Sequence, residues 1–548
     1  MDPFLQDPPR ASNRFRTDRT LRYALERILP ADVFDEASSE LDALGQRALE
    51  QLAPLAARAE ANPPQHHPFD AWGRRIDHIE VDPAWTALVR IGQEVGLTAI
   101  PYEQRFGEHA RVVHGAALDL FMPASATADC PLAMTDAAAR VLLNDDAELA
   151  ERYVPRLTAR TDGWTSGQWM TEKEGGSDVG RTGTVARRNA DGTWTLHGTK
   201  WFTSATTAEV ALALARPEGA EEGSRGLSLF LLELRRPDGS WNGLTVRRLK
   251  DKLGTKALPT AELDLEGTVA VPVGGMGRGV PKIAPMLNIT RVHAAFGSLA
   301  AIGGGLDLAR DYAGKRAAFG KVLRDLPLHR AWIARIAAEY EATTALAFRA
   351  AELLGQVERG AGDPVLTRVV VPLAKMAVSR QAVWATSNLM ESFGGAGYLE
   401  DTGLPRMLRD AHVNCIWEGT TSVMALDTLR ALGSNGAGER FLDDIDERLG
   451  AAEHPALAEA VARARDARAR LSKLLTEPTE QGARRIAWGM ARTYEAALVC
   501  EAAQWALDTK QNGSVAVAAT MLAREPMVGP ELPADDDLGA LAFGDAGT

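Results

Sequence analysis

The stretch "MTEKEGGSDVGRTGTVARRNADGTWTLHGTKWFTSA", residues 170–205, marks an abrupt change in the pattern of the chain. It begins with a polar segment rich in Gly, Ser and Thr and continues as two runs in which apolar and polar residues alternate. Asp191 and Gly192 lie between these runs, and an Asp-Gly pair in that position is a strong signal for a β-hairpin. We therefore expect strands here.

On both sides of this stretch the pattern is helical. Before it, segments such as "LDALGQRALEQLAPLAARAEA" (41–61) are rich in Ala and Leu with apolar residues at helical spacing, and only "ANPPQHHPFDAWGRR" (61–75) is interpreted as a loop. After it, "LSLFLLEL" and "TAELDLEGTVAV" are predicted strands, followed by helices. We predict an α+β protein, mostly α, with four domains: 1–160 helical, 161–278 β, 279–433 helical, and 434–548, an extra helical segment with an acidic tail.

One later helix has an especially clear apolar stripe. In "AVSRQAVWATSNLMESFGG" (377–395) apolar residues follow one another 4, 3, 4 and 4 positions apart, and Gly394 and Gly395 end the pattern. The sequence predicts a buried helix that stops at this glycine pair.

Composition narrows the function classes. The 548 residues include 61 Lys and Arg against 73 Asp and Glu, which argues against a surface built throughout to bind nucleic acid. Three scattered cysteines indicate neither a disulfide framework nor a zinc cluster, and we expect no metal site. The N-terminal residues do not resemble a signal peptide, and no run of 18 apolar residues occurs, so we expect a cytoplasmic protein without a membrane span.

The common catalytic motifs are also missing. No complete G-x-G-x-x-G follows a predicted strand, and neither a phosphate-binding loop motif nor H-E-x-x-H occurs. "GGSDVG" (175–180) differs from a nucleophile elbow because its second glycine comes one position too late. Classical nucleotide-fold, zinc-protease and serine-hydrolase functions are therefore disfavoured.

A single acid stands out in "NCIWEGTTSVM" (414–424). Glu418 follows the apolar residues Ile416 and Trp417. A carboxylate in this setting is either a solvated loop residue or a base that the apolar surroundings adapt to proton transfer.

Five motifs in a fixed order connect these features. They are "MTEKEGGSDVGRTG" (170–183), "GTKWFTSA" (198–205), "KRAAFGK" (315–321), "ESFGGAGYLED" (391–401) and "IWEGTT" (416–421). In this order and spacing the chain resembles the FAD-dependent acyl-CoA dehydrogenases. "PFDAWGRRIDHIEVDPAW" (68–85), "RLKDKLGTK" (248–256), "LPRMLRDAHVNCIWEG" (404–419) and the extra C-terminal segment resemble the AidB-like branch of that family, which includes a flavoprotein of the bacterial response to DNA alkylation.

The resemblance implies an N-terminal helical domain, a central β-barrel or sandwich domain and a C-terminal four-helix bundle, here followed by the extra helical domain. It also implies a homotetramer made of two dimers. FAD would lie between the β domain and the bundle, and its adenosine part would reach a neighbouring subunit.

The same resemblance assigns residues to the cofactor. Thr171 and Thr203 would hydrogen-bond the flavin ring, Trp201 would pack against it, and Arg316 and Phe319 would meet the pyrophosphate or adenine across the dimer. The full set of expected cofactor-binding residues is Met170, Thr171, Ser177, Trp201, Thr203, Arg316, Phe319, Glu391, Gly394, Gly395 and Thr420.

Glu418 stands where most family members place the catalytic base. The resemblance implies that it removes a proton next to a thioester carbonyl while the flavin accepts a hydride from the β carbon. Some members place their base immediately before an arginine on an earlier helix, but here that position, before Arg291, is Thr290. We expect Glu418 to be the base, and Ser177, Arg291 and Trp417 to lie near the acyl-CoA or a related thioester.

Some positions depart from the usual family pattern. Glu391 replaces a glutamine, "DLPLHR" (325–330) replaces another, and Trp417 replaces a tyrosine. These differences favour an unusual acyl thioester over an ordinary straight-chain fatty acyl-CoA, and they leave FAD unaffected. An electron-accepting flavoprotein is the partner that the family would supply.

The AidB-like resemblance raises a second hypothesis, a DNA-associated flavoprotein of the alkylation-damage response with weak dehydrogenase activity. Residues 439–548 contain 12 basic and 19 acidic residues, which is poor for contact with phosphates. The most basic stretch, "RARDARARLSK" (463–473), fits a solvated helix, although a patch formed across a tetramer could still bind duplex DNA.

Overall fold

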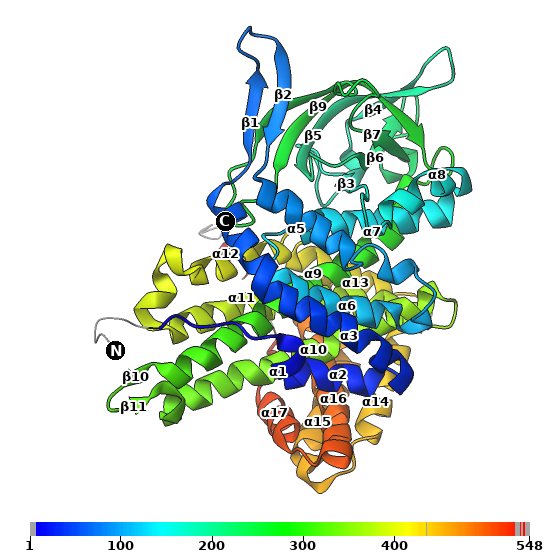
Figure 1. Cartoon of the computed structure of the whole chain (residues 1–548). Helices are drawn as coiled ribbons and strands as arrows, with labels where there is room; N and C mark the ends of the chain where they lie inside the picture. Colours follow the sequence, from blue (N-terminus) through cyan, green and yellow to red (C-terminus); the bar gives the residue numbers. More distant parts are fainter. Residues whose placement is uncertain (1–6, 435, 532–537, 539–540, 543–548) are drawn as a thin grey trace.

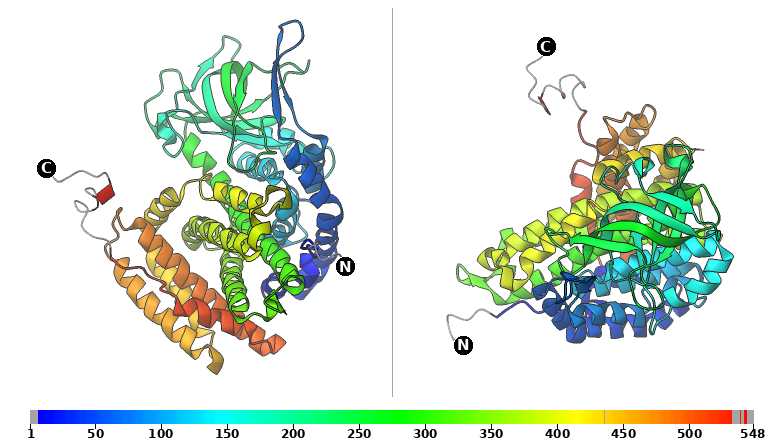
Figure 2. Two further views of the ribbon diagram at one scale, coloured as in Figure 1. Left: turned by 90° about the vertical axis from the view of Figure 1, so that its left-hand side faces the viewer. Right: turned by 90° about the horizontal axis from the view of Figure 1, so that it is seen from above.

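The computed structural model describes residues 7–434, 436–531, 538 and 541–542. A β domain lies above a large helical body, and one further group of helices packs on the side of that body (Figures 1 and 2). The expected fold, with an N-terminal helical domain, a central β domain and a helical bundle, is confirmed.

The N-terminal part is mostly helical. Asp18, Asp82 and Asp146 each accept a hydrogen bond from a backbone N–H group in the first turn of the helix that follows, which satisfies donors that the helix itself leaves free. The helices are α1 (Arg14–Thr17), α2 (Arg19–Ile28), α3 (Ala31–Arg47), α4 (Ala53–Ala61), α5 (Pro83–Glu94), α6 (Ala110–Phe121), α7 (Asp129–Asp145) and α8 (Ala147–Leu157), with a π-helical turn at Ala48–Leu52 between α3 and α4.

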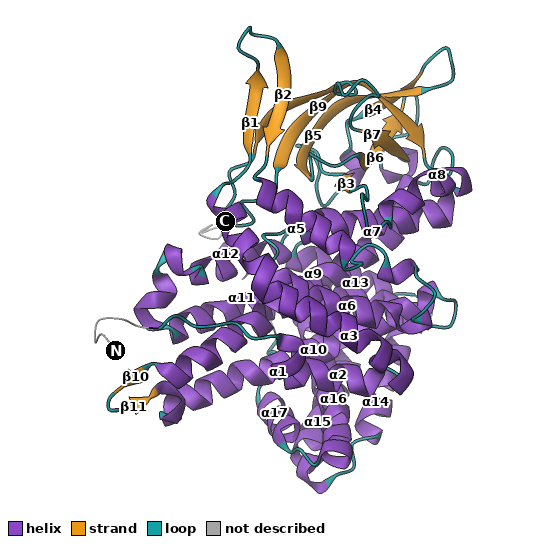
Figure 3. Cartoon of the chain, viewed as in Figure 1, coloured by secondary structure: helices purple, strands orange, loops and turns teal. Residues whose placement is uncertain are grey.

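The segment interpreted as a loop at 61–75 contains a strand, so that prediction was wrong. β1 (Gln65–Phe69) pairs antiparallel with β2 (Arg75–Glu80), and the hairpin projects beside the β domain (Figure 3). Its turn is closed by the carboxylate of Asp70, which accepts from the backbone N–H groups of Trp72 and Arg74. Arg75 donates to the carbonyl of Val246, so a tertiary contact supports strands that the Pro- and His-rich sequence did not indicate.

The β domain is a seven-stranded sheet among the described residues. Strands β6, β4, β5, β9 and β7 follow one another, and β7 pairs again with β6, which closes the sheet into a barrel. The predicted hairpin around Asp191 and Gly192 is confirmed as the antiparallel pair β4–β5. The strands are β3 (Ser166–Trp169), β4 (Val185–Arg188), β5 (Trp194–Ser204), β6 (Val210–Pro217), β7 (Ser228–Glu233), β8 (Leu244–Leu249) and β9 (Thr260–Pro272).

The bundle is built from long helices with apolar interiors. The predicted stripe on α11 is confirmed, because Val378, Ala382, Ala385, Leu389 and Phe393 are all buried. The elements are α9 (Gly279–Lys315), a small β10–β11 hairpin (Ala317–Ala318 and Lys321–Val322), α10 (Pro327–Glu358), α11 (Pro364–Ser392), α12 (Leu404–Asn414) and α13 (Thr421–Leu432). Of the described helices, α9 alone is long and apolar enough to span a membrane, but 72% of that apolar window is buried inside the protein, as in a core helix.

Four more helices, α14 (Ala437–Gly450), α15 (Ala458–Leu474), α16 (Ala483–Lys510) and α17 (Ser514–Arg524), form the extra C-terminal part. A buried ion pair fastens it to the bundle, since the guanidinium of Arg492 on α16 meets Glu339 on α10 at 2.7 Å. Burial raises the pKa of the neighbouring Glu495 to about 7, against the opposing charge of Arg492. Most of the predicted acidic tail lies outside the described residues, which after 531 are 538 and 541–542.

Candidate active site

The base predicted from sequence lies in a tight turn between α12 and α13, which we call the base loop (residues 416–420). Glu418 has a φ of 56° and Gly419 a φ of 104°, both in the left-handed region, which a non-glycine residue enters only at a cost. Thr420 then caps α13, its hydroxyl accepting from the N–H of Val423. The short reversal between two helices therefore sets the direction of the Glu418 side chain.

The carboxylate of Glu418 is half-buried and is held from α9. The hydroxyl of Thr290 donates to its Oε2 at 2.7 Å, although the two residues are 128 positions apart in sequence. Thr290 occupies the alternative base position noted in the sequence, and here it is a hydrogen-bond partner of the base. One carboxylate oxygen is thus fixed by the protein.

Arg291, predicted to lie near the substrate, belongs to a neighbouring ion cluster. Its Nη1 is 2.9 Å from Oδ2 of Asp427 on α13, and Arg368 on α11 contacts the same carboxylate. Burial would raise the pKa of Asp427, but the bonds and charges of the two arginines outweigh burial and lower it. This cluster ties α9, α11 and α13 together directly behind the base loop.

A thiol and a hydroxyl from the other two domains approach the same place. Cys130 on α7 and Ser204 at the end of β5 interact through their side chains, and the Cys130 thiol also lies within electrostatic range of Glu418. Burial raises the pKa of this thiol. The charge of Glu418 therefore reaches a side chain of the N-terminal domain, whereas Trp417 donates its indole N–H to Asn414 at 2.9 Å.

The segment after β3 and the end of β5 are adjacent, as the sequence predicted. The backbone N–H of Trp201 donates to the carbonyl of Thr171 at 2.9 Å. The ammonium of Lys250 lies 3.5 Å from the centre of the Trp201 ring and 4.6 Å from that of Phe202. These contacts create a wall with exposed aromatic surface.

Thr203 is hydrogen-bonded within the β domain, and its role at the flavin ring stays a prediction. Its side chain is fully buried, and its hydroxyl donates to the carbonyl of Ala261 on β9 at 2.7 Å, so it faces away from the open side of the strand. Phe202, which is 54% exposed, and the half-buried Ser204 face the open side instead. Both belong to the motif at 198–205 that carries the family resemblance, and β5 has an irregular register between Lys200 and Thr203, which disturbs simple alternation.

The Gly-rich segment after Met170 is anchored by a buried acid that the sequence did not single out. Glu172 accepts from the ammonium of Lys200 and the hydroxyl of Thr184, each at 2.6 Å, and from the backbone N–H of Gly183. Burial would raise the pKa of Glu172, but Lys200 and the hydrogen bonds lower it. This anchor leaves Ser177 exposed at the surface of the loop, while Met170 is buried beneath it.

A second group of predicted residues lies at the opposite end of α9. Arg316 follows the last residue of the helix, and Phe319, at the tip of the β10–β11 hairpin, is 96% exposed. Gly394 and Gly395 are close by, because the ring of Phe393 packs on Tyr312 of α9. At 1.5 Å per residue, the 25 residues from Thr290 to the end of α9 span about 38 Å, so Arg316 lies far from the base loop of the same chain.

This second group has room for a ligand. A Cβ added at Gly394 or Gly395 would meet no atom within 4 Å, and Glu391 beside them is exposed. The side chain of Phe319 is also almost fully exposed. These residues leave space for a group that approaches close to the backbone, and their role at FAD stays a prediction of the resemblance.

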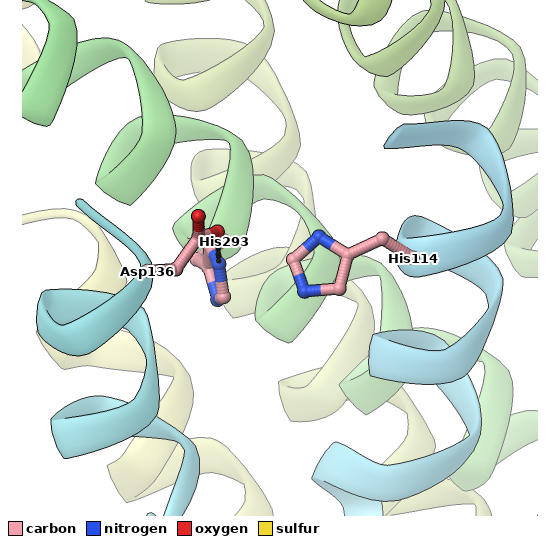
Figure 4. Close-up of side chains that lie close together, drawn as sticks. All are labelled: His114, Asp136 and His293. Atoms are coloured by element: carbon pink, nitrogen blue, oxygen red, sulfur yellow. Dashed lines mark hydrogen bonds and ion pairs between the residues drawn. The ribbon is translucent and has the colours of Figure 1, made fainter. Parts of the chain in front are cut away.

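A separate polar cluster lies inside the protein on α6, α7 and α9 (Figure 4). Ligand-type atoms of His114, Asp136 and His293 lie within 4.8 Å of one another, a spacing compatible with a metal ion. The carboxylate of Asp136, however, is already paired with the guanidinium of Arg111, and Tyr102 donates to it as well. Arg111 supplies the positive charge of this cluster, so we interpret it as a structural network.

Comparisons with known proteins agree with this architecture. Family models match residue ranges along most of the chain: the AidB N-terminal domain at 6–162, the acyl-CoA dehydrogenase middle domain at 167–268, the acyl-CoA dehydrogenase C-terminal domain at 277–433, and an acyl-CoA dehydrogenase 11 C-terminal domain-like model at 438–524.

Two curated relatives and one solved structure are informative. The chain is 40% identical to acyl-CoA dehydrogenase family member 11 of Caenorhabditis elegans over 96% of this chain and 90% of that protein. It is 34% identical to putative acyl-CoA dehydrogenase AidB of Escherichia coli over 69% and 71%. The crystal structure of Caenorhabditis elegans ACDH-11 in complex with C11-CoA superposes with a TM-score of 0.95 at 38% identity, covering 100% of this chain and 98% of that chain.

The chain belongs to the acyl-CoA dehydrogenase family, and it carries the N-terminal domain of the AidB-like branch. It is accordingly an oxidoreductase of the acyl-CoA dehydrogenase type. FAD is the cofactor of this family, which confirms the prediction of FAD made from the sequence motifs.

Proposed function

We propose that the protein removes hydrogen from the α and β carbons of an acyl-CoA thioester, with Glu418 as the base. The observation that supports this role is the fixed, half-buried carboxylate of Glu418 in the turn between α12 and α13, which the Thr290 hydroxyl of α9 holds at 2.7 Å. A carboxylate in such a site can reach a weakly acidic C–H group only if its position is set in advance.

In the proposed reaction Glu418 takes the α proton, and the C–H bond electrons remain on the substrate and form the α,β double bond. FAD, when bound, supplies the acceptor for the β hydrogen and its electron pair. Phe202 and Trp201 would form the wall against which the ring system packs, and Ser204 would offer a hydroxyl beside it. Arg291 keeps the rear of the base loop in place through Asp427.

Anaerobic titration of the FAD-loaded protein with acyl-CoA thioesters tests the proposal. The panel includes the C11 thioester, because the related Caenorhabditis elegans protein was crystallised with C11-CoA, together with shorter, longer and branched chains. We expect at least one thioester to bleach the flavin absorption. Glu418→Gln should retain FAD and slow bleaching by at least about 100-fold, the usual contribution of a positioned base.

Two results would contradict the proposal. If no thioester bleaches the wild-type flavin, acyl-CoA dehydrogenation is not the reaction; if Glu418→Gln bleaches as fast as the wild type, another group is the base. Glu477→Gln is a matched control, because it removes the charge of an exposed acid in the connection between α15 and α16, which has no proposed role in the reaction. It should bleach at a rate close to that of the wild type.

We further propose that the cofactor site is completed by a second copy of the chain in a homotetramer, and that an electron-accepting flavoprotein reoxidises the flavin. The first statement is supported by the position of Arg316 at the end of α9, about 38 Å along the helix from Thr290 and the base loop. Arg316→Ala should then lower FAD retention, which is measured as the flavin-to-protein absorbance ratio after gel filtration, while Glu418→Gln should not.

The relationship to AidB does not by itself extend this proposal to DNA. The arginines of the basic stretch on α15 are engaged within the protein: Arg463 pairs with Glu459, Arg468 with Asp446, and Arg470 with Asp466. Internal pairing leaves less positive charge for phosphates. The DNA hypothesis predicts a complex in a low-salt gel-shift titration with duplex DNA, and the dehydrogenase proposal does not require one.

A further inference from the structure

A lysine on α11 lies directly beneath the base loop. Lys375 is 1% exposed, and its ammonium donates a hydrogen bond to the carbonyl of Gly419, the residue that follows Glu418. Burying an ammonium is costly unless it meets a charge or a good acceptor. The contact that Lys375 makes with the base loop therefore has to account for the presence of a buried lysine here.

The surroundings of Lys375 include the base itself. Burial lowers the pKa of Lys375 to about 8, and the negative charge of Glu418 works in the opposite direction. Cys415 also supports the charged form, whereas Arg291 opposes it. The ammonium thus lies within electrostatic range of the carboxylate that is proposed to take the proton.

The peptide that Lys375 holds is a strained one. Glu418 and Gly419 both have positive φ, and for a glutamate this conformation is unfavourable unless the surroundings enforce it. Thr290 of α9 fixes the carboxylate, but it does not fix the backbone on the other side of the Glu418 Cα. The bond from Lys375 to the Gly419 carbonyl supplies that second point of attachment, from a different helix.

We infer that Lys375 is a positioning residue for the base: it locks the base loop in the conformation that presents Glu418 and places a positive charge beside the carboxylate. This inference rests on the proposed function of Glu418. It predicts a defect in proton removal, and not in thioester binding or FAD retention, when the lysine is replaced.

Lys375→Met keeps length and apolar volume but removes the donor and the charge. Lys282→Met is the matched control, because Lys282 is also buried and its ammonium donates to the carbonyls of Val273, Gly274 and Gly275 before α9. Both FAD-loaded variants are compared with the wild type by amide hydrogen exchange and by anaerobic flavin reduction with the best thioester of the panel.

For Lys375→Met we expect amide exchange in residues 414–424 to be at least about tenfold faster and the limiting rate of flavin reduction to fall about 10- to 100-fold, as for a misplaced catalytic group. The half-saturating thioester concentration should change less than about threefold, and the acid limb of the pH–rate profile should move to higher pH because a nearby cation is lost. Lys282→Met should speed exchange only near 273–279 and leave flavin reduction within about twofold.

Lys375→Gln separates the two roles, since an amide keeps an N–H donor without the charge. In Lys375→Gln, amide exchange in residues 414–424 should return toward the wild-type rate, while the acid limb of the pH–rate profile should still be shifted. This variant also replaces Lys375→Met in the experiment if Lys375→Met does not fold. Unchanged exchange and unchanged reduction in Lys375→Met would overturn the inference, and so would faster exchange with an unchanged reduction rate. If no thioester reduces the wild-type flavin, the proposed function fails, and an unchanged exchange rate still overturns the loop contact.

Discussion

Two polar clusters lie close together on α9, one at the base loop and the other around His293. Thr290 and Arg291 serve the first cluster, where the carboxylate of Glu418 remains half-buried. His293 serves the second, where Asp136 is fully buried and is bound by Arg111, Tyr102 and the imidazole of His293. Glu418 is held by one side-chain hydrogen bond and stays accessible to other molecules. Asp136 already has hydrogen-bond partners inside the protein and is not accessible.

The difference indicates how each cluster responds to change. Removing a partner at the base loop should affect reactivity more than stability, because the carboxylate can still reach solvent. Removing a partner in the His293 cluster should affect stability more than reactivity, because a buried charge would lose its counter-charge.

The largest expected effect is that of Asp136→Asn. The change leaves the buried guanidinium of Arg111 with Glu358 as its remaining acid partner, so we expect a loss of about 3 kcal/mol in unfolding free energy, the lower part of the range for a broken buried ion pair. Urea denaturation followed by circular dichroism measures this loss. The flavin reduction rate of the folded fraction should stay within about twofold of the wild type, and a rate loss exceeding tenfold would contradict the assignment of this cluster to stability.

A smaller effect, on reaction rate and not on stability, is expected for Thr290→Val. Valine has the same shape but cannot donate to Glu418, so the limiting rate of flavin reduction should fall about tenfold, or about 1.4 kcal/mol, with little change in the urea midpoint. Thr343→Val is the control, because the Thr343 hydroxyl is also buried but donates to backbone carbonyls within α10. Equal rate losses in both variants would show that the base loop has no special sensitivity.

A third expected effect is a gradual dependence of stability on pH. Burial, followed by the charge of His293, lowers the pKa of His114 well below its usual range, so the folded protein keeps this ring neutral. The unfolded chain binds a proton below about pH 6.5, and stability should therefore fall as the pH drops below that value, by at most about 1.4 kcal/mol per pH unit for this group.

Urea midpoints at pH 7, 6 and 5 measure this dependence. His114→Gln should reduce the slope, whereas His78→Gln, at an exposed position, should leave it unchanged. Asp136 and Arg111 keep their charges in this window, since the pKa of Asp136 is lowered by Arg111 and His293 despite its burial. Identical slopes in the wild type and His114→Gln would remove His114 as the cause.

Much of the fold could be predicted because its signals are local. The Asp191-Gly192 turn, the stripe on α11 and the glycine pair that ends it are decided by neighbouring residues, and the structure contains each of them. The β1–β2 hairpin could not be predicted, because its strands are supported by Val246, more than 160 positions away. Local propensity carries no information about such a partner.

For the candidate site, too, some features follow from the sequence and others only from the tertiary structure. Sequence alone determined which motifs are present, and with them the family, FAD and Glu418 as the proposed base. Only the tertiary structure decided that Thr290 bonds to Glu418, that Lys375 holds Gly419, and that Phe202 and Ser204, in place of Thr203, face the open side of β5. The physical reason is that a motif specifies residue types along the chain, whereas the direction of a side chain depends on strand register and on helices that meet it from distant positions.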